Sequence, residues 1–458
     1  MPSKPSAIPA IVWFRRDLRL SDQAAVLAAA AEGPVIPVYV LDDETPRHRR
    51  MGAASRWWLH HSLLSLDAAL QARGSKLILR RGRCDAVLSA IAHETGAQTV
   101  HCLAHYEPWW RNAERALGKV LHLRCHEGIT LAPAGTVRNG SGAPYRIFTP
   151  FWRALSQRLP PPAALPAPDR MPSPDRWPPS DQLDDWGLLP TSPDWAAGFR
   201  AEWTPGEAGA QARLDAFAQR AARYAEQRNL PSEAGTSKLS PHLHFGEISP
   251  AAAWHGTASA GGSVGTFQGE LGWRDYAQNV ILQFPDYGNQ PARDGFDRFG
   301  WRDAPDELRA WQQGRTGYPI VDAGMRELWA TGWMHNRVRM IAASFLIKHL
   351  LIDWREGERW FWDTLVDADY GSNAVNWQWS AGSGVDSNMF VRIMAPLTQS
   401  PKFEAADYIR RWVPELAHLG NDAVHDPPIP PRGYPAKIVP HAEARARALA
   451  AFAEMRDN

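Results

Sequence analysis

Residues 11–19 read Ile-Val-Trp-Phe-Arg-Arg-Asp-Leu-Arg, and this stretch sets the fold of the first third of the chain. Four apolar residues run directly into a charged turn, which is typical of a buried strand that ends at a sheet edge. Short apolar runs and longer amphipathic segments then alternate up to residue 125. This rhythm predicts an α/β domain over residues 1–135 with a doubly wound parallel five-stranded sheet. Strands are expected at residues 11–14, 35–41, 76–80, 99–103 and 120–125, with helices at 23–31, 53–73, 85–95 and 109–117.

A proline-rich stretch separates this part from the rest of the chain. Residues 159–207 are rich in Pro, Ser and Asp. Proline lacks a backbone N–H and fixes φ, so the stretch cannot hold a long helix, and we expect an interdomain connector over 136–207. Amphipathic segments without strand alternation follow, which predicts an all-α domain over 208–458. Helices are expected at residues 214–228, 266–283, 304–311, 320–331, 337–351 and 359–365.

Composition excludes several classes of protein. The 458 residues exceed the ~250–300 that one hydrophobic core usually serves, so at least two domains are expected. The net charge of +1 does not by itself indicate a nucleic-acid partner. Cys84, Cys102 and Cys125 are too few for a four-cysteine iron–sulfur cluster and argue against a disulfide framework. Residues 1–9 hold no apolar leader, and the apolar run 340–352 is interrupted by charge, so a cytoplasmic protein without membrane spans is expected.

The turn at residues 15–19 carries no Gly-x-Gly-x-x-Gly fingerprint, so ordinary dinucleotide binding is not expected there. Residues 235–241, Gly-Thr-Ser-Lys-Leu-Ser-Pro, are a second candidate for phosphate binding. Ser240 would be a good N-cap and Pro241 a good first helical residue. Small hydroxyl residues and free N–H groups before a helix suit a pyrophosphate. By itself, the segment fits a plain capped turn better.

Two further segments place polar and aromatic residues at helical spacing. If residues 333–340 are helical, Trp333, Asn336, Arg337 and Met340 share one face, which suits a polar, aromatic cavity. The alternative is a solvated helix face with the indole tucked underneath.

Glu270, Trp273 and Arg274 also lie at i, i+3 and i+4. Apolar neighbours would desolvate Glu270 and leave it protonated, as a hydrogen-bond donor. By itself, the spacing fits better with a surface ion pair between Glu270 and Arg274, worth only ~0.3–0.5 kcal/mol.

Residues 367–379 combine two acids, two asparagines and two indoles. Asp367 and Asp369 could ligate a metal, but neither a dense set of oxygen ligands nor a calcium-loop spacing surrounds them, so no metal is expected. His242 and His244 lack a third ligand nearby in sequence, so structural roles are favoured over zinc.

Taken together, these segments resemble the photolyases of the cryptochrome/photolyase family. The resemblance runs through residues 12–19, 145–151, 270–274, 316–319 and 408–412, in order, over nearly the whole chain. It implies an α/β domain joined by a long connector to a helical domain that holds a folded FAD. The implied FAD contacts are Tyr224, Thr236, Ser237, Lys238, Leu239, Ser240, Phe267, Arg274, Trp333, Arg339, Asp367, Asp369 and Asn373, with Asn373 facing flavin N5.

The resemblance also implies the reaction: light-driven splitting of cyclobutane pyrimidine dimers in DNA, single- or double-stranded, by a monomer of class I. The implied catalytic residues are Glu270, Asn336 and Met340, together with Asn373. A dimer flipped out of the duplex would stack on Trp273 and Trp379, and Arg228 and Arg337 would hold its phosphates. A neutral Glu270 and the Asn336 amide would donate to the thymine carbonyl on which charge develops.

Trp377, Trp354 and Trp301 match the family's chain for electron transfer to an oxidised flavin; core packing is the alternative. Val375, Asn376, Asp275 and Gly272 depart from the usual pattern, and such departures reshape pockets.

The first domain could hold an antenna pigment, namely methenyltetrahydrofolate, a deazaflavin or another flavin, or it could hold none; the presence and the identity of the pigment both stay open. The main rival function is a cryptochrome-type blue-light receptor. A flavoprotein electron carrier and a plain DNA-binding module are weaker rivals, because neither needs both the flavin segments and the pocket residues.

Overall fold

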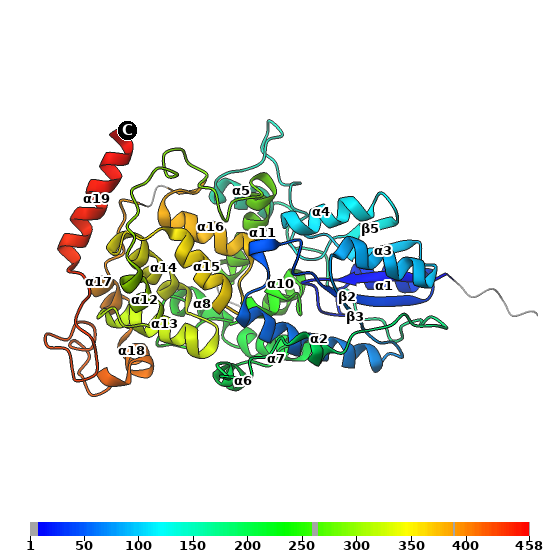
Figure 1. The fold of residues 1–458 in the computed structure, drawn as a ribbon, viewed down its shortest axis with the longest axis horizontal. Coiled ribbons are helices and arrows are strands. Elements are labelled where there is room, and N and C mark those ends of the chain that lie inside the picture. The colour runs from blue at the N-terminus through cyan, green and yellow to red at the C-terminus, as the bar shows by residue number, and fades with distance from the viewer. Residues whose placement is uncertain (1–7, 259–263, 388–389, 458) are drawn as a thin grey trace, which may run out of the picture.

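The computed structural model describes residues 8–258, 264–387 and 390–457. An α/β domain and a larger helical domain pack side by side (Figure 1). The five predicted strands are present and all pairs are parallel, in the order β3-β2-β1-β4-β5. They are β1 (Ala10–Phe14), β2 (Val35–Leu41), β3 (Ile78–Arg81), β4 (Thr99–Leu103) and β5 (His122–His126). The predicted doubly wound sheet is therefore confirmed, although β3 and β5 begin two residues later than expected.

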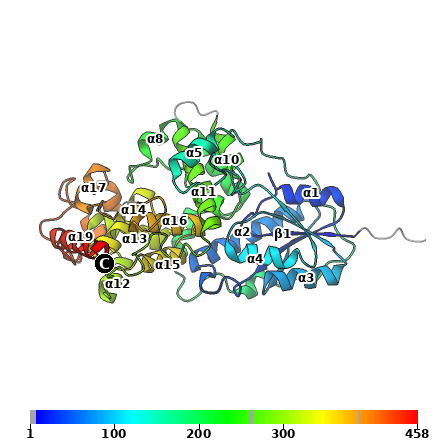
Figure 2. The ribbon, with the colours of Figure 1, turned by 90° about the horizontal axis from the view of Figure 1, so that it is seen from above.

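Helices cover both faces of the sheet, as its apolar strands require. Alternate residues of β1 enter different cores: Val12 and Phe14 pack with α1 and α2, whereas Ile11 and Trp13 pack with α3 and α4. Figure 2 shows α1 on one side of the sheet and α3 and α4 on the other. The helices are α1 (Ala24–Glu32), α2 (Ala53–Gln71), α3 (Cys84–Thr95) and α4 (Pro108–Leu117).

The segment between the two domains is largely irregular, as its prolines predict. Residues 157–182 contain no helix or strand. Backbone hydrogen bonds join Met171, Pro172 and Asp181 of this segment to the α/β domain, and the Pro161 carbonyl contacts His255 of the helical domain. The short helices are α5 (Phe148–Ser156), which packs against α11, α6 (Ala197–Glu202) and the 3-10 turn η2 (Leu183–Trp186).

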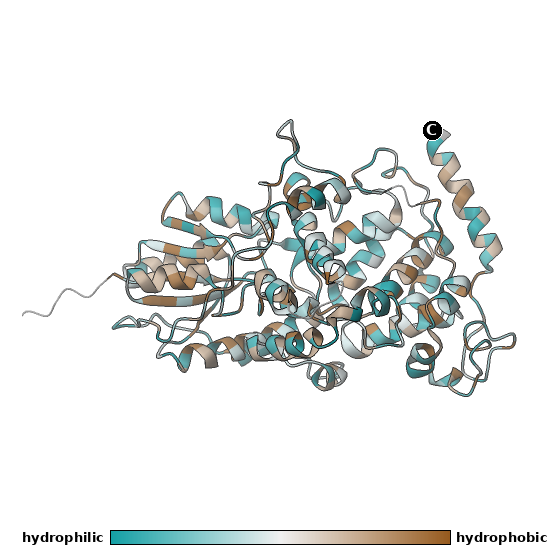
Figure 3. Ribbon diagram, turned by 180° about the vertical axis from the view of Figure 1, so that it is seen from behind, coloured by the Kyte–Doolittle hydropathy of each residue, from teal (hydrophilic) through white to brown (hydrophobic). Residues whose placement is uncertain are grey.

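The helical domain contains no strand in the part of residues 207–457 that the structure describes. Its longer helices are α7 (Glu207–Ala218), α10 (Pro250–Ala258), α11 (Gly265–Gln283), α12 (Pro305–Gln312), α13 (Pro319–Thr331), α14 (Asn336–Ser344), α15 (Trp354–Thr364), α16 (Tyr370–Ala381) and α19 (His441–Asp457). Shorter ones are α8 (Tyr224–Gln227), α9 (Ser240–His244), α17 (Pro396–Lys402) and α18 (Ala406–Trp412), with 3-10 turns η3 (Ala221–Arg223) and η5 (Pro414–Leu416); the 3-10 turn η1 (Arg47–Arg49) lies before α2 in the α/β domain. Polar and apolar residues alternate along many of these helices (Figure 3), whereas α13 and α16 are buried over most of their residues. No described helix is both long and apolar enough to cross a membrane.

Three predicted helices differ from the observed ones. The helix expected at 214–228 is divided into the end of α7, the 3-10 turn η3 and the short helix α8. The helix expected at 337–351 is α-helical only to Ser344 and continues as a π-helical turn, η4 (Phe345–His349). α14 also begins at Asn336, because the side chain of His335 accepts a hydrogen bond from Arg337 N and caps it. Trp333 therefore precedes the helix, and the predicted four-residue stripe on one helix face is wrong.

Candidate active site

A cavity of about 450 Å³ lies in the helical domain, walled by α9, α11, α14 and α16. Small-molecule sites usually have volumes of ~300–1,000 Å³. Most residues predicted to contact cofactor or substrate line it: Tyr224, Arg228, Thr236, Ser237, Lys238, Ser240, Phe267, Glu270, Trp273, Arg274, Trp333, Asn336, Arg337, Arg339, Met340, Asp367, Asp369 and Trp379. Leu239 does not, since its side chain is fully buried in the adjacent core.

The hydroxyl-rich segment before α9 forms one wall of the cavity. Ser240 is the first residue of α9 rather than its N-cap, and no side chain caps this helix. The Ser240 hydroxyl instead accepts a hydrogen bond from the Trp333 indole at 3.2 Å. The predicted cap is therefore wrong, because α9 begins one residue earlier than expected and Leu239 occupies the N-cap position. Lys238, with φ of 51°, pairs with Glu202 at 2.8 Å and lies 5.0 Å from the Trp333 ring.

Charged side chains from both domains lie close together behind a second wall of the cavity. Arg16, in the turn after β1, lies 3.8 Å from the Asp369 carboxylate and 3.1 Å from Nδ1 of His244. Burial lowers the pKa of Arg16 to about 10. Arg274 donates through Nη2 to the Leu243 carbonyl at 3.0 Å, while its buried Nη1 has no acceptor among the described residues. A buried guanidinium donor in a cavity wall fits a ligand that supplies an acceptor oxygen or nitrogen.

Asp367 is occupied by a neighbouring cation. Both of its carboxylate oxygens accept from the Arg339 guanidinium, at 3.0 and 2.9 Å. This two-point pairing holds both side chains at the cavity wall.

Asn373 is held from the α/β domain through a buried relay. Its Nδ2 donates to the Glu358 carboxylate at 2.9 Å and to the Glu358 carbonyl at 3.1 Å. Glu358 in turn accepts from Arg49 Nη1 at 2.6 Å, and Arg49 also donates to Gly288. Because both Glu358 groups are acceptors, the amide nitrogen of Asn373 must point to them, which leaves Oδ1 for other partners. Asn373 lines a smaller cavity of about 90 Å³ that shares Asn336, Arg339, Met340, Asp367, Ser372, Asn376 and Trp379 with the first.

Glu270 has a different partner from either sequence alternative. It forms an ion pair with Arg228, and not with Arg274 four residues along its own helix. Its side chain is 34% exposed, so the burial predicted for this carboxyl is not observed. Arg228 reaches it from a segment 42 residues away, which no spacing rule on one helix reveals. Arg337 donates to Asn229 Oδ1 at 2.5 Å.

The aromatic residues at the cavity are partly used by packing. Trp273 stacks on Phe148 with ring centroids 3.6 Å apart and planes 9° apart, so one face of its indole is covered. Trp379 is half-buried at the cavity wall. Stacking of a flat ligand on both faces of Trp273 is therefore excluded by Phe148.

The predicted tryptophan chain is not a run of direct ring contacts. Trp377 lines the smaller cavity, and its ring neighbours are Phe361 at 5.0 Å and Trp311 at 6.3 Å. Trp354 is fully buried, and the half-buried Trp301 packs on Phe299. Trp311, which the sequence analysis did not single out, is fully buried beside Trp377 although α12 is largely polar.

Two of the four departures from the family pattern have a structural explanation. The Asp275 carboxylate accepts from the backbone N–H groups of Leu131 and Ala132 at 2.9 and 3.1 Å, so it ties α11 to the last residues of the α/β domain. A Cβ on Gly272 would lie 2.3 Å from the Trp152 ring, so this position needs glycine for that packing. Val375 and Asn376 line the cavity.

Two family models match this chain. Residues 10–169 match the family model for DNA photolyase, and residues 267–454 match the model for the FAD binding domain of DNA photolyase. The helical domain is thus an FAD-binding domain of the photolyase type.

Relatives that match this chain over nearly its whole length are photolyases and cryptochromes. A deoxyribodipyrimidine photo-lyase from Agrobacterium fabrum is 47% identical over 98% of both chains. A crystal structure of a bacterial class III photolyase from Agrobacterium tumefaciens superposes with a TM-score of 0.95 at 46% identity, over all of both chains. Cryptochrome-1 of Arabidopsis thaliana is 36% identical over 97% of this chain and 70% of its own length. The chain therefore belongs to the photolyase/cryptochrome family, as the sequence predicted.

The observed residues fit FAD. The hydroxyl-rich segment at 236–240 with Lys238 offers donors and a cation for phosphates, and Arg274 Nη1 offers a buried donor without a partner. Phe267 and Trp333 add flat apolar walls, and Asn373 presents an amide oxygen. Together these supply the mixture of aromatic walls and few placed polar groups that cofactor sites use.

Proposed function

We propose that this chain is a light-driven DNA repair enzyme that splits cyclobutane pyrimidine dimers. The observation that carries the proposal is one continuous cavity wall: residues that fit FAD and the residues Glu270, Asn336 and Met340 line the same space. A dimer in this cavity would lie beside the cofactor without an intervening layer of protein. We further infer class III rather than the class I expected from sequence, because the class III structure matches the whole of both chains.

The chain's own groups would bind and orient the lesion. When bound, reduced FAD supplies the excited electron that opens the cyclobutane ring and takes it back afterwards. Paired with Arg228, the Glu270 carboxylate is an acceptor for the N–H groups of the two bases. Arg228 and the Asn336 amide can donate to base carbonyls, where negative charge develops during the reaction. Placing the charge stabilisation on Arg228 replaces the neutral Glu270 expected from the sequence.

Two further parts of the site have supporting roles in this proposal. The free face of Trp273 and the Trp379 indole would stack on the flipped bases, and Arg337 would contact the DNA backbone. The Asn373 amide oxygen can accept from an N–H at flavin N5 without adding negative charge. Trp377, Trp354 and Trp301 remain our candidates for supplying electrons to oxidised FAD, and a second chromophore in the α/β domain remains an expectation.

A repair assay tests the proposal against a cryptochrome-type receptor. The FAD-loaded, reduced protein is mixed with ultraviolet-irradiated oligothymidylate and exposed to blue light, with a dark sample as the control. We expect thymine absorbance to recover in the illuminated sample and not in the dark sample. Bound FAD without any recovery would refute repair and favour the receptor.

A further inference from the structure

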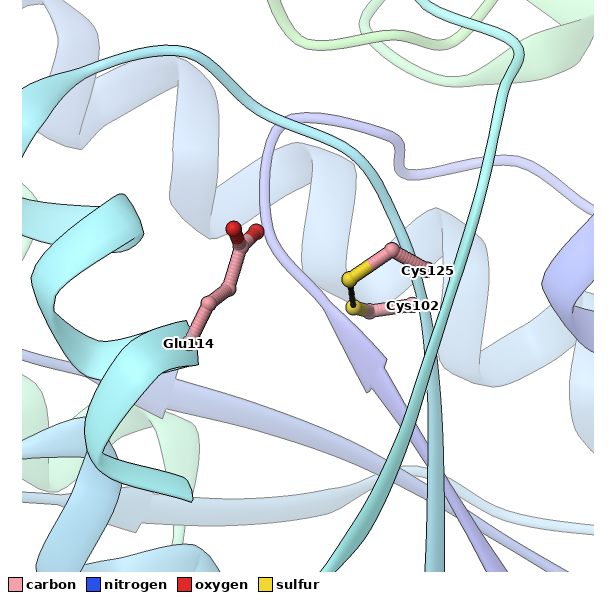
Figure 4. A group of neighbouring side chains, drawn as sticks. All are labelled: Cys102, Glu114 and Cys125. Atoms are coloured by element: carbon pink, nitrogen blue, oxygen red, sulfur yellow. Dashed lines mark hydrogen bonds between the residues drawn. The ribbon is translucent and has the colours of Figure 1, made fainter. Parts of the chain in front are cut away.

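Two of the three cysteines lie side by side at an edge of the sheet, on strands that do not line the cavity. Cys102 on β4 and Cys125 on β5 are direct partners in the parallel register. Their Sγ atoms lie 3.6 Å apart (Figure 4). Paired strands are ~4.8 Å apart, which falls within the ~4.4–6.8 Å between Cα atoms that a disulfide spans. The pair can therefore close without moving the strands.

The two thiols have unequal surroundings. Cys102 is fully buried, whereas Cys125 is exposed on the edge strand. The hydrogen bond with Cys125, and then burial, raise the pKa of Cys102 well above its usual value. The same hydrogen bond lowers the pKa of Cys125. An accessible cysteine with a lowered pKa beside a buried thiol is the arrangement of a reactive cysteine and its resolving partner.

Glu114 completes this cluster but is already paired. Its ligand oxygen and the two sulfur atoms all lie within 4.8 Å of one another. Arg15 Nη1 donates to Glu114 Oε1 at 2.7 Å and keeps a guanidinium charge beside the sulfurs. Structural zinc needs four ligands, and the described residues supply three, one of them held by a cation. Thiol chemistry is therefore favoured over metal binding.

We propose that Cys102 and Cys125 form a redox-active dithiol that closes to an intrachain disulfide by exchange with low-molecular-weight disulfides. The Cys125 thiolate attacks one sulfur of the small disulfide, breaks its S–S bond and releases one thiolate. Cys102 loses its proton and attacks Cys125 Sγ, which releases the second thiolate and forms the protein disulfide. The dithiol loses two electrons, the small disulfide gains them, and the two released thiolates take up the two protons.

The test treats the full chain with oxidised glutathione, then alkylates the remaining thiols under denaturing conditions and measures mass. We expect one alkylated cysteine, Cys84, with Cys102 and Cys125 in one disulfide-linked peptide that dithiothreitol separates. Cys84→Ser is the matched control and should still close the disulfide. Cys102→Ser should retain glutathione on Cys125, because no resolving thiol remains. In Cys125→Ser the buried Cys102 should stay reduced.

Three outcomes would overturn the proposal. One is that all three cysteines of the oxidant-treated wild type are still alkylated. Another is that glutathione stays attached to wild-type Cys125. The third is that protein incubated with zinc chloride and desalted keeps one zinc ion, that this ion is absent from Cys125→Ser, and that it blocks oxidation; the pair would then be a metal site.

Discussion

Replacing Arg49 with methionine tests whether the α/β domain holds the Asn373 relay in place. Arg49 is 5% exposed and donates at 2.6 Å to both carboxylate oxygens of Glu358, which is fully buried. Removing one partner of a buried ion pair costs about 3–5 kcal/mol, because the remaining charge is unpaired. The Gly288 carbonyl also loses its donor. We expect the free energy of unfolding to fall by about 4 kcal/mol at pH 8.

The loss should depend on pH. Burial, opposed by Arg49, raises the pKa of Glu358 above its usual value, and removing Arg49 raises it further. A protonated Glu358 has no unpaired charge, so the difference from wild type should shrink as pH falls from 8 through this raised pKa. Urea unfolding followed by tryptophan fluorescence at pH 8 and 5 measures both effects.

Arg50 provides the matched control, since it is the exposed neighbour of Arg49. Arg50→Met should change stability by no more than about 0.5 kcal/mol. If Arg49→Met unfolds at the same urea concentration as Arg50→Met, the ion pair between Arg49 and Glu358 does not contribute to the free energy of unfolding, and the reasoning is refuted. The absorbance spectrum of FAD bound to the folded Arg49→Met variant gives a second readout. An Asn373 amide that is no longer held by Glu358 should alter this spectrum.

Three further predictions concern other residues. Glu270→Ala should lower dimer repair at least tenfold while FAD content stays unchanged; unaltered repair would show that this carboxylate does not contact the bases. Trp377→Phe should slow photoreduction of oxidised FAD by an added thiol by more than tenfold, and unchanged bleaching under blue light would exclude this indole from the path. Burial raises the pKa of Asp275 to about 7, so this carboxyl binds its proton more tightly when folded and wild-type stability should fall as pH rises from 4 to 7. In Asp275→Asn that slope should be shallower, and equal slopes in urea unfolding would contradict the assignment.

Local patterns were sufficient for much of the fold and part of the site. The β1 stretch and the repeats after it predicted the parallel sheet, because strand and helix periods reflect burial on one face or two. The proline-rich stretch predicted the irregular segment over 157–182 for an equally local reason, the missing N–H groups. The candidate cofactor segments were recognised because they contain polar and aromatic residues that a hydrophobic core does not require. Most of the predicted cofactor residues line one cavity.

Pairings between distant segments were decided only by the tertiary structure. Glu270 forms an ion pair with Arg228, and Glu358 forms one with Arg49 from the other domain. The Trp333 indole donates a hydrogen bond to the Ser240 hydroxyl. Each contact replaced an interaction that spacing along one helix had suggested, or added one that spacing does not show. A sequence pattern records which face of an element is buried, but the partner on that face depends on how whole helices and strands pack. For the same reason, three widely spaced cysteines gave no sign of a pair until β4 and β5 aligned in register.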